Sequence, residues 1–148
     1  VVNINGSSTS SNNTNGIQVV ANPGGSNNEL VQLTNRLQGS VTTADATVTT
    51  IITFALPSTG TYSIDINVAA YNTTDTAGAA YSLFVGIKSV AGVATKLNLE
   101  DKIVNEEATM ILCNSSITVS GNSVLVQVTG LVGKSIDWNA VGTYTYVG

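Results

Sequence analysis

The sequence predicts an all-β protein, an antiparallel β-sandwich or a jelly-roll-like barrel of about eight strands. Three observations indicate this fold class. Apolar and polar residues alternate with a period of two from Ser40 onward, and clusters of Gly, Pro, Asn and Ser separate the alternating runs. Helical spacing is almost absent. Short strands at intervals of about 8 to 14 residues are typical of sandwiches and barrels.

The first part of the chain differs from this regular pattern. Residues 1–28 include a tract of Asn, Ser and Thr without periodicity. Such a tract predicts an extended polar arm or attachment segment rather than a packed element. The β-sandwich domain is expected over residues 40–148.

Residues 29–39 are expected to form a short helix or connector between the arm and the sandwich. Leu30, Leu33 and Leu37 have helical spacing, and Gly39 is suited to end a helix. Val31, Leu33 and Leu37 also fit a period of two, so a strand is an open alternative.

The alternating runs predict both strands and their buried faces. In the first run, Val48, Ile52, Phe54 and Leu56 are expected to share one face. Trp138, in an Ile-x-Trp-x-Ala pattern, is expected in the core. The five clearest runs are residues 47–56, 62–68, 81–88, 124–129 and 143–147.

The composition excludes several function classes. Of 148 residues, Lys and Arg number 5, Asp and Glu number 9, and His is absent. Five basic residues cannot neutralise many phosphates, so no nucleic-acid partner is expected. Without His, the commonest general base and metal ligand are missing, and we expect no enzyme activity, no metal and no cofactor. No apolar run reaches the roughly 18 residues of a membrane span, so no membrane insertion is expected.

Few residues allow a chemical interpretation. Glu106 and Glu107 suggest a carboxylate pair, but neighbouring residues of a strand point to opposite faces, which favours a solvated loop. Cys113 is expected to be a buried structural residue rather than a nucleophile, because no His could activate its thiol. No catalytic residue is predicted. Tyr71, Tyr81 and Tyr144 are the candidate ligand-binding residues, as exposed surfaces on which a sugar could stack.

Small neutral polar residues are abundant in this chain, and charged residues are scarce. Thr, Ser and Asn number 20, 15 and 16, and charged residues make up 9% of the chain against about 25% in an average domain. Uncharged strand surfaces cost little to desolvate, which favours a tight homo-oligomeric interface. The residues expected on these surfaces are Thr47, Thr49, Thr53, Ala69, Ala79 and Ala80.

A series of sequence phrases recurs in a specific order along residues 33–148. They lie at residues 33–43, 45–54, 60–68, 78–81, 104–108, 118–122, 126–130 and 136–138. In these phrases the chain resembles the C-terminal domain of bacteriophage tail-fibre and related virion proteins. Similar domains end bacterial collagen-like adhesins. Val48 stands where the family often has Pro.

The resemblance implies a non-enzymatic structural protein on the virion surface, a homotrimer that acts as a tail-fibre tip, a capsid-bound fibre or a decoration protein. Residues 1–28 would attach it to other virion proteins. The alternative is a carbohydrate-binding adhesin module that recognises a host glycan from a virion or a bacterial cell surface. A polysaccharide depolymerase that uses Glu106 and Glu107 is a third hypothesis.

Overall fold

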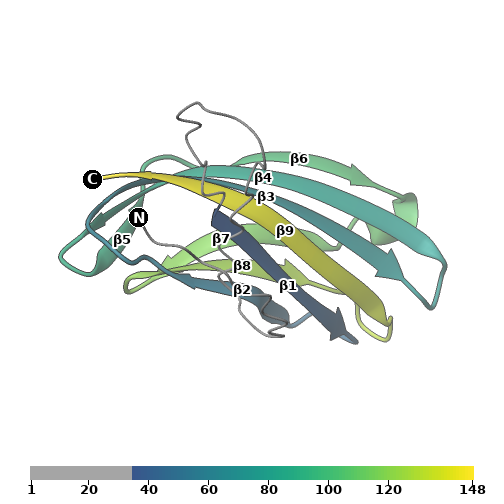
Figure 1. Cartoon of the computed structure of the whole chain (residues 1–148). Coiled ribbons are helices and arrows are strands. Elements are labelled where there is room, and N and C mark those ends of the chain that lie inside the picture. Colours follow the sequence, from purple (N-terminus) through teal and green to yellow (C-terminus); the bar gives the residue numbers. More distant parts are fainter. Residues whose placement is uncertain (1–34) are drawn as a thin grey trace, which may run out of the picture.

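The structure is a computed structural model of the chain, and it describes residues 35–148. In these residues nine strands form a six-stranded and a three-stranded sheet, both antiparallel (Figure 1). The predicted antiparallel sandwich is confirmed, and the two sheets do not close into a barrel. The expectations for residues 1–28 and 29–34 lie outside the described residues.

The large sheet has the strand order β1–β9–β3–β4, and β5 and β6 both pair with the remaining edge of β4. The small sheet has the order β2–β8–β7. A 3-10 turn, η1 (Ala108–Met110), lies between β6 and β7. The strands are β1 (Asn35–Thr43), β2 (Val48–Ala55), β3 (Gly60–Asn72), β4 (Ala77–Val90), β5 (Val93–Lys96), β6 (Asp101–Glu106), β7 (Asn114–Ser120), β8 (Ser123–Thr129) and β9 (Ile136–Val147).

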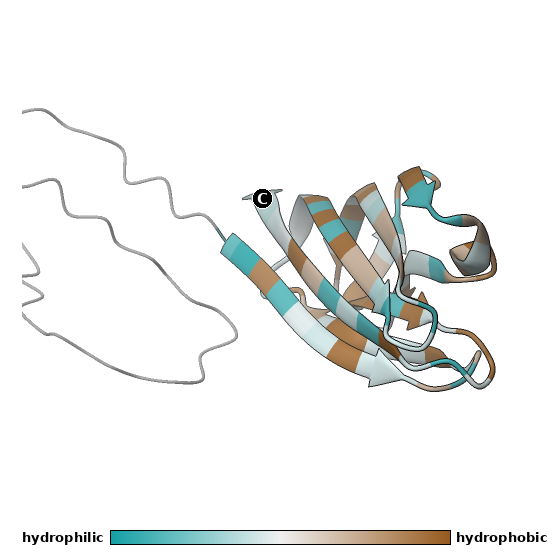
Figure 2. Cartoon of the chain, turned by 90° about the vertical axis from the view of Figure 1, so that its right-hand side faces the viewer, coloured by the Kyte–Doolittle hydropathy of each residue, from teal (hydrophilic) through white to brown (hydrophobic). Residues whose placement is uncertain are grey.

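The long strands β3, β4 and β9 bury alternate residues between the two sheets. On β3 these are the even-numbered residues from Tyr62 to Ala70, while Asp65, Asn67 and Ala69 point outward. The alternation is visible as bands of contrasting hydropathy along the strands in Figure 2. Burial of each large apolar side chain contributes about 1.5–3 kcal/mol.

Trp138 is buried in this core, as predicted. Its Nε1 donates a hydrogen bond of 2.9 Å to Oγ1 of Thr43, so the one polar atom of the indole is paired. The ring stacks on Tyr81, with 6.2 Å between the ring centroids. Trp138 therefore connects β1, β4 and β9.

The helix expected over residues 29–39 is wrong for residues 35–39, which begin β1. Leu37 is buried and pairs with Gly142 of β9. A strand here satisfies the backbone groups of β9 as well as its own, and this tertiary gain outweighs a weak helical spacing. The strand alternative holds for these five residues.

The predicted face of Val48 is wrong, because Val48 is 57% exposed. A β-bulge is the reason: Thr50 pairs with Gln127 and Ile52 with Val126, which leaves Ile51 as an extra residue. One extra residue reverses the face of every position before it. Ile52, Phe54 and Leu56 are buried as predicted.

Gly142 provides a test of the packing between β3 and β9. A Cβ atom at this position would stand 2.2 Å from the carbonyl oxygen of Asp65, so Gly142→Ala must push the two strands apart. We expect the free energy of unfolding, measured by urea denaturation, to fall by about 1–3 kcal/mol. Gly78→Ala is the matched control, because its nearest neighbour would lie at 3.7 Å. Equal effects of the two substitutions would contradict this account.

Candidate functional site

The structure separates the three candidate tyrosines. Tyr71 is 50% exposed on the outer face of the large sheet, whereas Tyr81 is only 2% exposed in the core. Tyr144 is half-buried on the inner face. The prediction of an exposed stacking surface is therefore wrong for Tyr81, and the three rings do not form one site.

Tyr81 is buried because the odd-numbered residues of β4 face the core. Its hydroxyl donates to Oε2 of Glu106 at 3.2 Å, and the Nζ of Lys102 lies 5.4 Å from its ring centroid. Burial, with the nearby carboxylate, raises the pKa of the Tyr81 phenol. Tyr81 thus serves packing between the sheets.

Tyr144 belongs to an aromatic cluster at the other end of the core. Its ring centroid lies 4.4 Å from that of Phe54 and 6.0 Å from that of Tyr62. Burial raises the pKa of the Tyr144 phenol. Most of the ring is therefore engaged by neighbours rather than free for a ligand.

Tyr71 points outward in a row of residues that crosses four strands of the large sheet. Its partners in the register are Asp137 on β9 and Gly78 on β4, and Asp137 in turn pairs with Thr42 on β1. Thr42 donates its hydroxyl to Oδ1 of Asp137 at 2.6 Å. The ring therefore has a carboxylate on one side and a residue without a side chain on the other.

Glu107 supplies a second carboxylate beside this row. Its Oε1 accepts the backbone N–H of Gly78 at 3.1 Å, and it lies 3.7 Å from the point where an outward Cβ of Gly78 would stand. Tyr71 thus lies between Asp137 and the carboxylate of Glu107 on the outer face. Sequence reasoning named Tyr71 and Glu107 separately and did not connect them with Asp137, and only strand register brings the three together.

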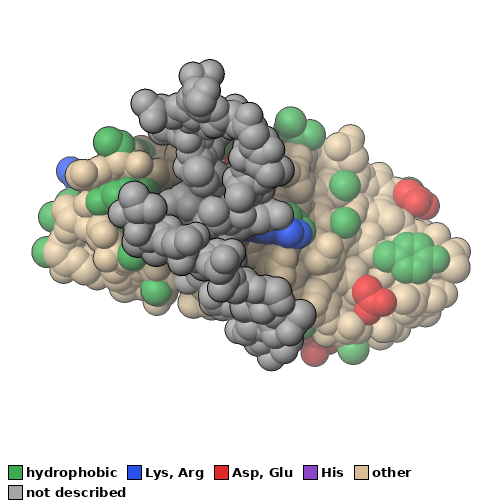
Figure 3. All heavy atoms as spheres, viewed as in Figure 1, with side chains coloured by type: hydrophobic (Ala, Val, Ile, Leu, Met, Phe, Trp, Pro, Cys, Tyr) green, Lys and Arg blue, Asp and Glu red, His purple; other side chains and the backbone are tan. Residues whose placement is uncertain are grey.

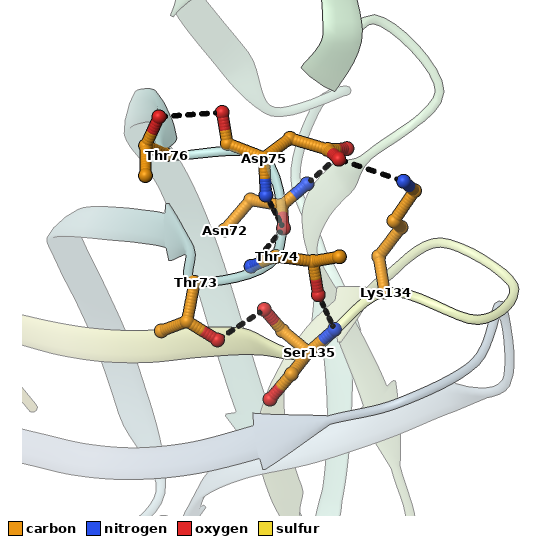
Figure 4. Close-up of polar contacts among 7 residues, drawn as sticks. All are labelled: Asn72, Thr73, Thr74, Asp75, Thr76, Lys134 and Ser135. Atoms are coloured by element: carbon orange, nitrogen blue, oxygen red, sulfur yellow. Dashed lines mark hydrogen bonds and ion pairs between the residues drawn. The ribbon is translucent and has the colours of Figure 1, made fainter.

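A network of hydrogen bonds joins the β3–β4 turn to the β8–β9 loop next to Tyr71 (Figure 4). Oδ1 of the buried Asn72 accepts the backbone N–H groups of Thr74 and Asp75, at 2.9 and 3.1 Å. Nζ of Lys134 lies 2.7 Å from Oδ1 of Asp75. Ser135 binds the same turn, because its N–H donates to Oγ1 of Thr74. These contacts fix the end of β3 that carries Tyr71.

The other candidate residues occupy separate environments. Glu106 and Glu107 bind different partners, the Tyr81 hydroxyl and the Gly78 amide. Cys113 is buried as predicted, and burial raises the pKa of its thiol. Within residues 35–148 no three His, Cys, Asp or Glu side chains are grouped as metal ligands. The same part of the chain contains no helix with the length and hydropathy needed to cross a bilayer.

Comparison with solved structures finds a likeness to phage tailspike proteins. The tailspike of Acinetobacter baumannii phage AM24 shares 12% identity at a TM-score of 0.39, over 76% of this chain and 27% of the tailspike. The tailspike of Acinetobacter phage vB_ApiP_P1 shares 14% identity at a TM-score of 0.36, over 88% of this chain and 26% of the tailspike. This chain spans about a quarter of the length of each. No protein-family model and no curated protein matches the chain.

Lys134 allows a test of the network at the end of β3. The hydrogen bond from Lys134 lowers the pKa of the Asp75 carboxyl, so Lys134→Met should raise that pKa toward the ordinary value of about 3.9. The ion pair stabilises the fold at pH values above the ordinary pKa of Asp, and this stabilisation is lost as the pH falls through the lowered pKa of Asp75. An NMR titration of the Asp75 carboxyl carbon measures the shift. Lys88→Met is the control on the outer face of β4, and an equal change there would refute the assignment.

Proposed function

We propose that the chain is a non-enzymatic virion structural protein that assembles as a homotrimer on the virion surface. It would act as a tail-fibre tip or as a capsid-bound fibre or decoration protein, with residues 1–28 attached to other virion proteins. The resemblance of residues 33–148 to tail-fibre C-terminal domains supports the location on the virion and the trimeric assembly. The observation that supports the proposed assembly is an exposed apolar patch at one edge of the large sheet.

This edge patch consists of Phe84, Leu97, Leu99 and Ile103. Phe84 points outward from β4, and Ile103 points outward from β6 at the diagonal position. Leu97 lies over Gly86, the next outward position on β4, where its Cδ1 would be 3.4 Å from a Cβ. Leu99 is 88% exposed and Ile103 is 65% exposed. Phe84, Leu97 and Ile103 therefore occupy neighbouring outward positions, and Leu99 is exposed in the same loop as Leu97. The direct register partners of Phe84 are Asp65 on β3 and Asp101 on β6, so two carboxylates border the patch.

Such a patch is unusual for an edge, because sheets usually protect their edge strands with charge, Pro or a covering element. On β6 the charged residues stand at the ends, and Ile103 and Val104 occupy the middle. Contiguous exposed apolar surface of this kind marks an interaction site. Burial against another copy would remove it from water.

Between Ile103 of the edge patch and β1 the outer face is free of charge, whereas the row that runs from Phe84 to β1 carries Asp65 and Arg36. In Figure 3, the part of this face that grey atoms leave visible is mostly tan, with few red or blue side chains. Two rows of outward positions cross five strands without an ionisable side chain, so removing water from them costs less free energy than removing it from charged residues. The first row consists of Gln38, Val141, Asn67, Ser82 and Ile103. The second consists of Ser40, Asn139, Ala69, Ala80 and Asn105.

Two of the residues expected on the neutral surface lie elsewhere. Ala79 is buried, because the odd-numbered residues of β4 point inward, and that prediction is wrong. Thr49 is half-buried, because the bulge at Ile51 turns it toward the core side of β2. Thr53, Ala69 and Ala80 are exposed as expected.

Sedimentation of the wild-type chain and a double variant tests assembly through the edge patch. We expect the wild type to sediment as a trimer at micromolar concentration. Leu99→Lys with Ile103→Lys should weaken association at least about tenfold, because two charges would have to be desolvated at the interface. Val132→Lys is the control, since Val132 is 80% exposed in the loop between β8 and β9 and should leave association unchanged.

A folded wild-type monomer throughout the micromolar range would overturn the assembly proposal. Circular dichroism of each variant separates loss of association from loss of fold. Electron microscopy of the particle, with an antibody against this chain, tests the location independently. Absence of label from purified particles would overturn the virion assignment.

A further inference from the structure

The strand β6 lies at the border of the large sheet and has an open edge (Figure 1). All six of its residues are exposed, and among residues 35–148 its only strand partner is β4. Hydrogen-bonded and non-hydrogen-bonded pairs alternate along an antiparallel ladder. Since the N–H of Glu107 donates to the carbonyl oxygen of Gly78, the odd-numbered residues of β6 direct their backbone groups toward β4. The N–H and C=O groups of the even-numbered residues, Lys102, Val104 and Glu106, therefore point away from the sheet.

The edge of β7 shows how this chain closes a strand edge with side chains. Nζ of Lys96 donates to the carbonyl oxygen of Ile117 at 2.7 Å, and the N–H of Ile117 donates to Oε2 of Glu100 at 2.7 Å. The two side chains, with Nζ and Oε2 3.4 Å apart, take the place of a neighbouring strand. Within residues 35–148 no side chain binds the backbone of β6 in this way, and β6 contains neither Pro nor a bulge. Edges of sheets are usually protected, so the edge of β6 is available for pairing.

The sequence of β6 is complementary to itself when two copies run antiparallel. Of the two-fold registers that the backbone allows, the one with its axis at Val104 pairs all three open residues. Val104 then stands opposite Val104 of the second copy, and Lys102 stands opposite Glu106 of the second copy on both sides of the axis. Opposite charges directly across a ladder stabilise it, whereas like charges destabilise it. An axis at Lys102 or at Glu106 would place like charges opposite each other.

The side chains of Lys102 and Glu106 keep hydrogen-bonding capacity for a second copy. They stand opposite inward-facing residues of β4, where Lys102 donates to Oδ1 of Asn114 and Oε2 of Glu106 accepts the Tyr81 hydroxyl. An ammonium group has three donors, and within the described residues Oε1 of Glu106 accepts no hydrogen bond. Ile103 lies on the opposite face of β6, with the edge patch. Pairing along the β6 edge therefore leaves the edge patch accessible.

We propose that β6 pairs antiparallel with β6 of a second copy, about a two-fold axis at Val104. The two large sheets would then continue into one another, and in the proposed trimer the pairing would join copies that belong to separate trimers. A six-residue strand gives a small contact, so we expect weak association that a covalent bond captures better than sedimentation does. The pairing needs only the edge of β6 and does not depend on the trimer.

Two cysteine variants test the register. Ile103 would stand opposite Asn105 of the second copy in a non-hydrogen-bonded pair, where the Cα atoms are about 4.5 Å apart and a disulfide can form. Each of these residues would stand roughly 8 Å from the same residue of the second copy, which is too far for a disulfide. The native Cys113 is buried and does not compete.

We therefore expect a mixture of Ile103→Cys and Asn105→Cys chains to form a covalent dimer under mild oxidation. Either variant alone should form at least about tenfold less. A denaturing gel shows the dimer whether or not the chain forms trimers, so a failed cross-link and a failed trimer are distinguishable. With both variants folded by circular dichroism, no dimer in the mixture, or equal yields from the mixture and the separate variants, would overturn the proposal.

Charge reversal tests the pairing of Lys102 with Glu106. Lys102→Glu, introduced into both cysteine variants, places carboxylates opposite each other and should lower the yield of the dimer about tenfold. Adding Glu106→Lys restores opposite charges and should restore the yield. A yield that Lys102→Glu leaves unchanged, or that the double reversal does not restore in a folded protein, would contradict this register.

Hydrogen exchange identifies what covers the edge. The N–H of Val104 should exchange rapidly in dilute solution and become protected as the protein concentration rises, because only a second copy satisfies it. Protection that is independent of concentration would mean that a segment of the same chain occupies the edge, and it would overturn the proposal.

Discussion

One-sided burial of the long strands β3, β4 and β9 is the constraint on which the remaining structure depends. Successive side chains of a strand point to opposite faces, so a slip of one residue would exchange the whole buried set for the outward set. On β3 such a slip would place Asp65 and Asn67 in the apolar core between the sheets, beside Ala140 and Tyr144 of β9, where neither would find partners. The register of the large sheet is fixed for this reason, and its outer face is left free of packing demands.

The alternation of successive side chains between the two faces of a strand explains which parts of the structure could be predicted from the sequence. The strands, the buried Trp138 and the buried Cys113 follow from local pattern alone. The sequence also contained the signal that Tyr81 faces inward, because Tyr81, Leu83 and Val85 are alternate residues and so lie on the same face of the strand. No local pattern reveals the bulge at Ile51, and the local pattern at residues 35–39 does not decide between helix and strand. Both depend on partners far along the chain, β8 and β9.

The low charge of the chain has a spatial distribution that composition could not show. The outer face combines an apolar edge bordered by Asp65 and Asp101, two uncharged rows in its centre and a charged row at the end of β3. Desolvation of the uncharged rows costs less free energy than desolvation of carboxylates, because amide and hydroxyl groups bind water less strongly than charged groups do. Glu107 and Asp137 were brought to Tyr71 by register, and no spacing in the sequence predicts that juxtaposition.

The same desolvation argument distinguishes the two ends of this face. A second copy that packed its own neutral strands over Asp137 and Glu107 would bury carboxylates without replacing the hydrogen bonds they make to water, at a cost of several kcal/mol. The edge patch has the opposite balance, since an apolar protein surface that covered Leu99 and Ile103 would lose no hydrogen bonds there. Assembly is therefore expected through the edge patch and not over the row of Tyr71.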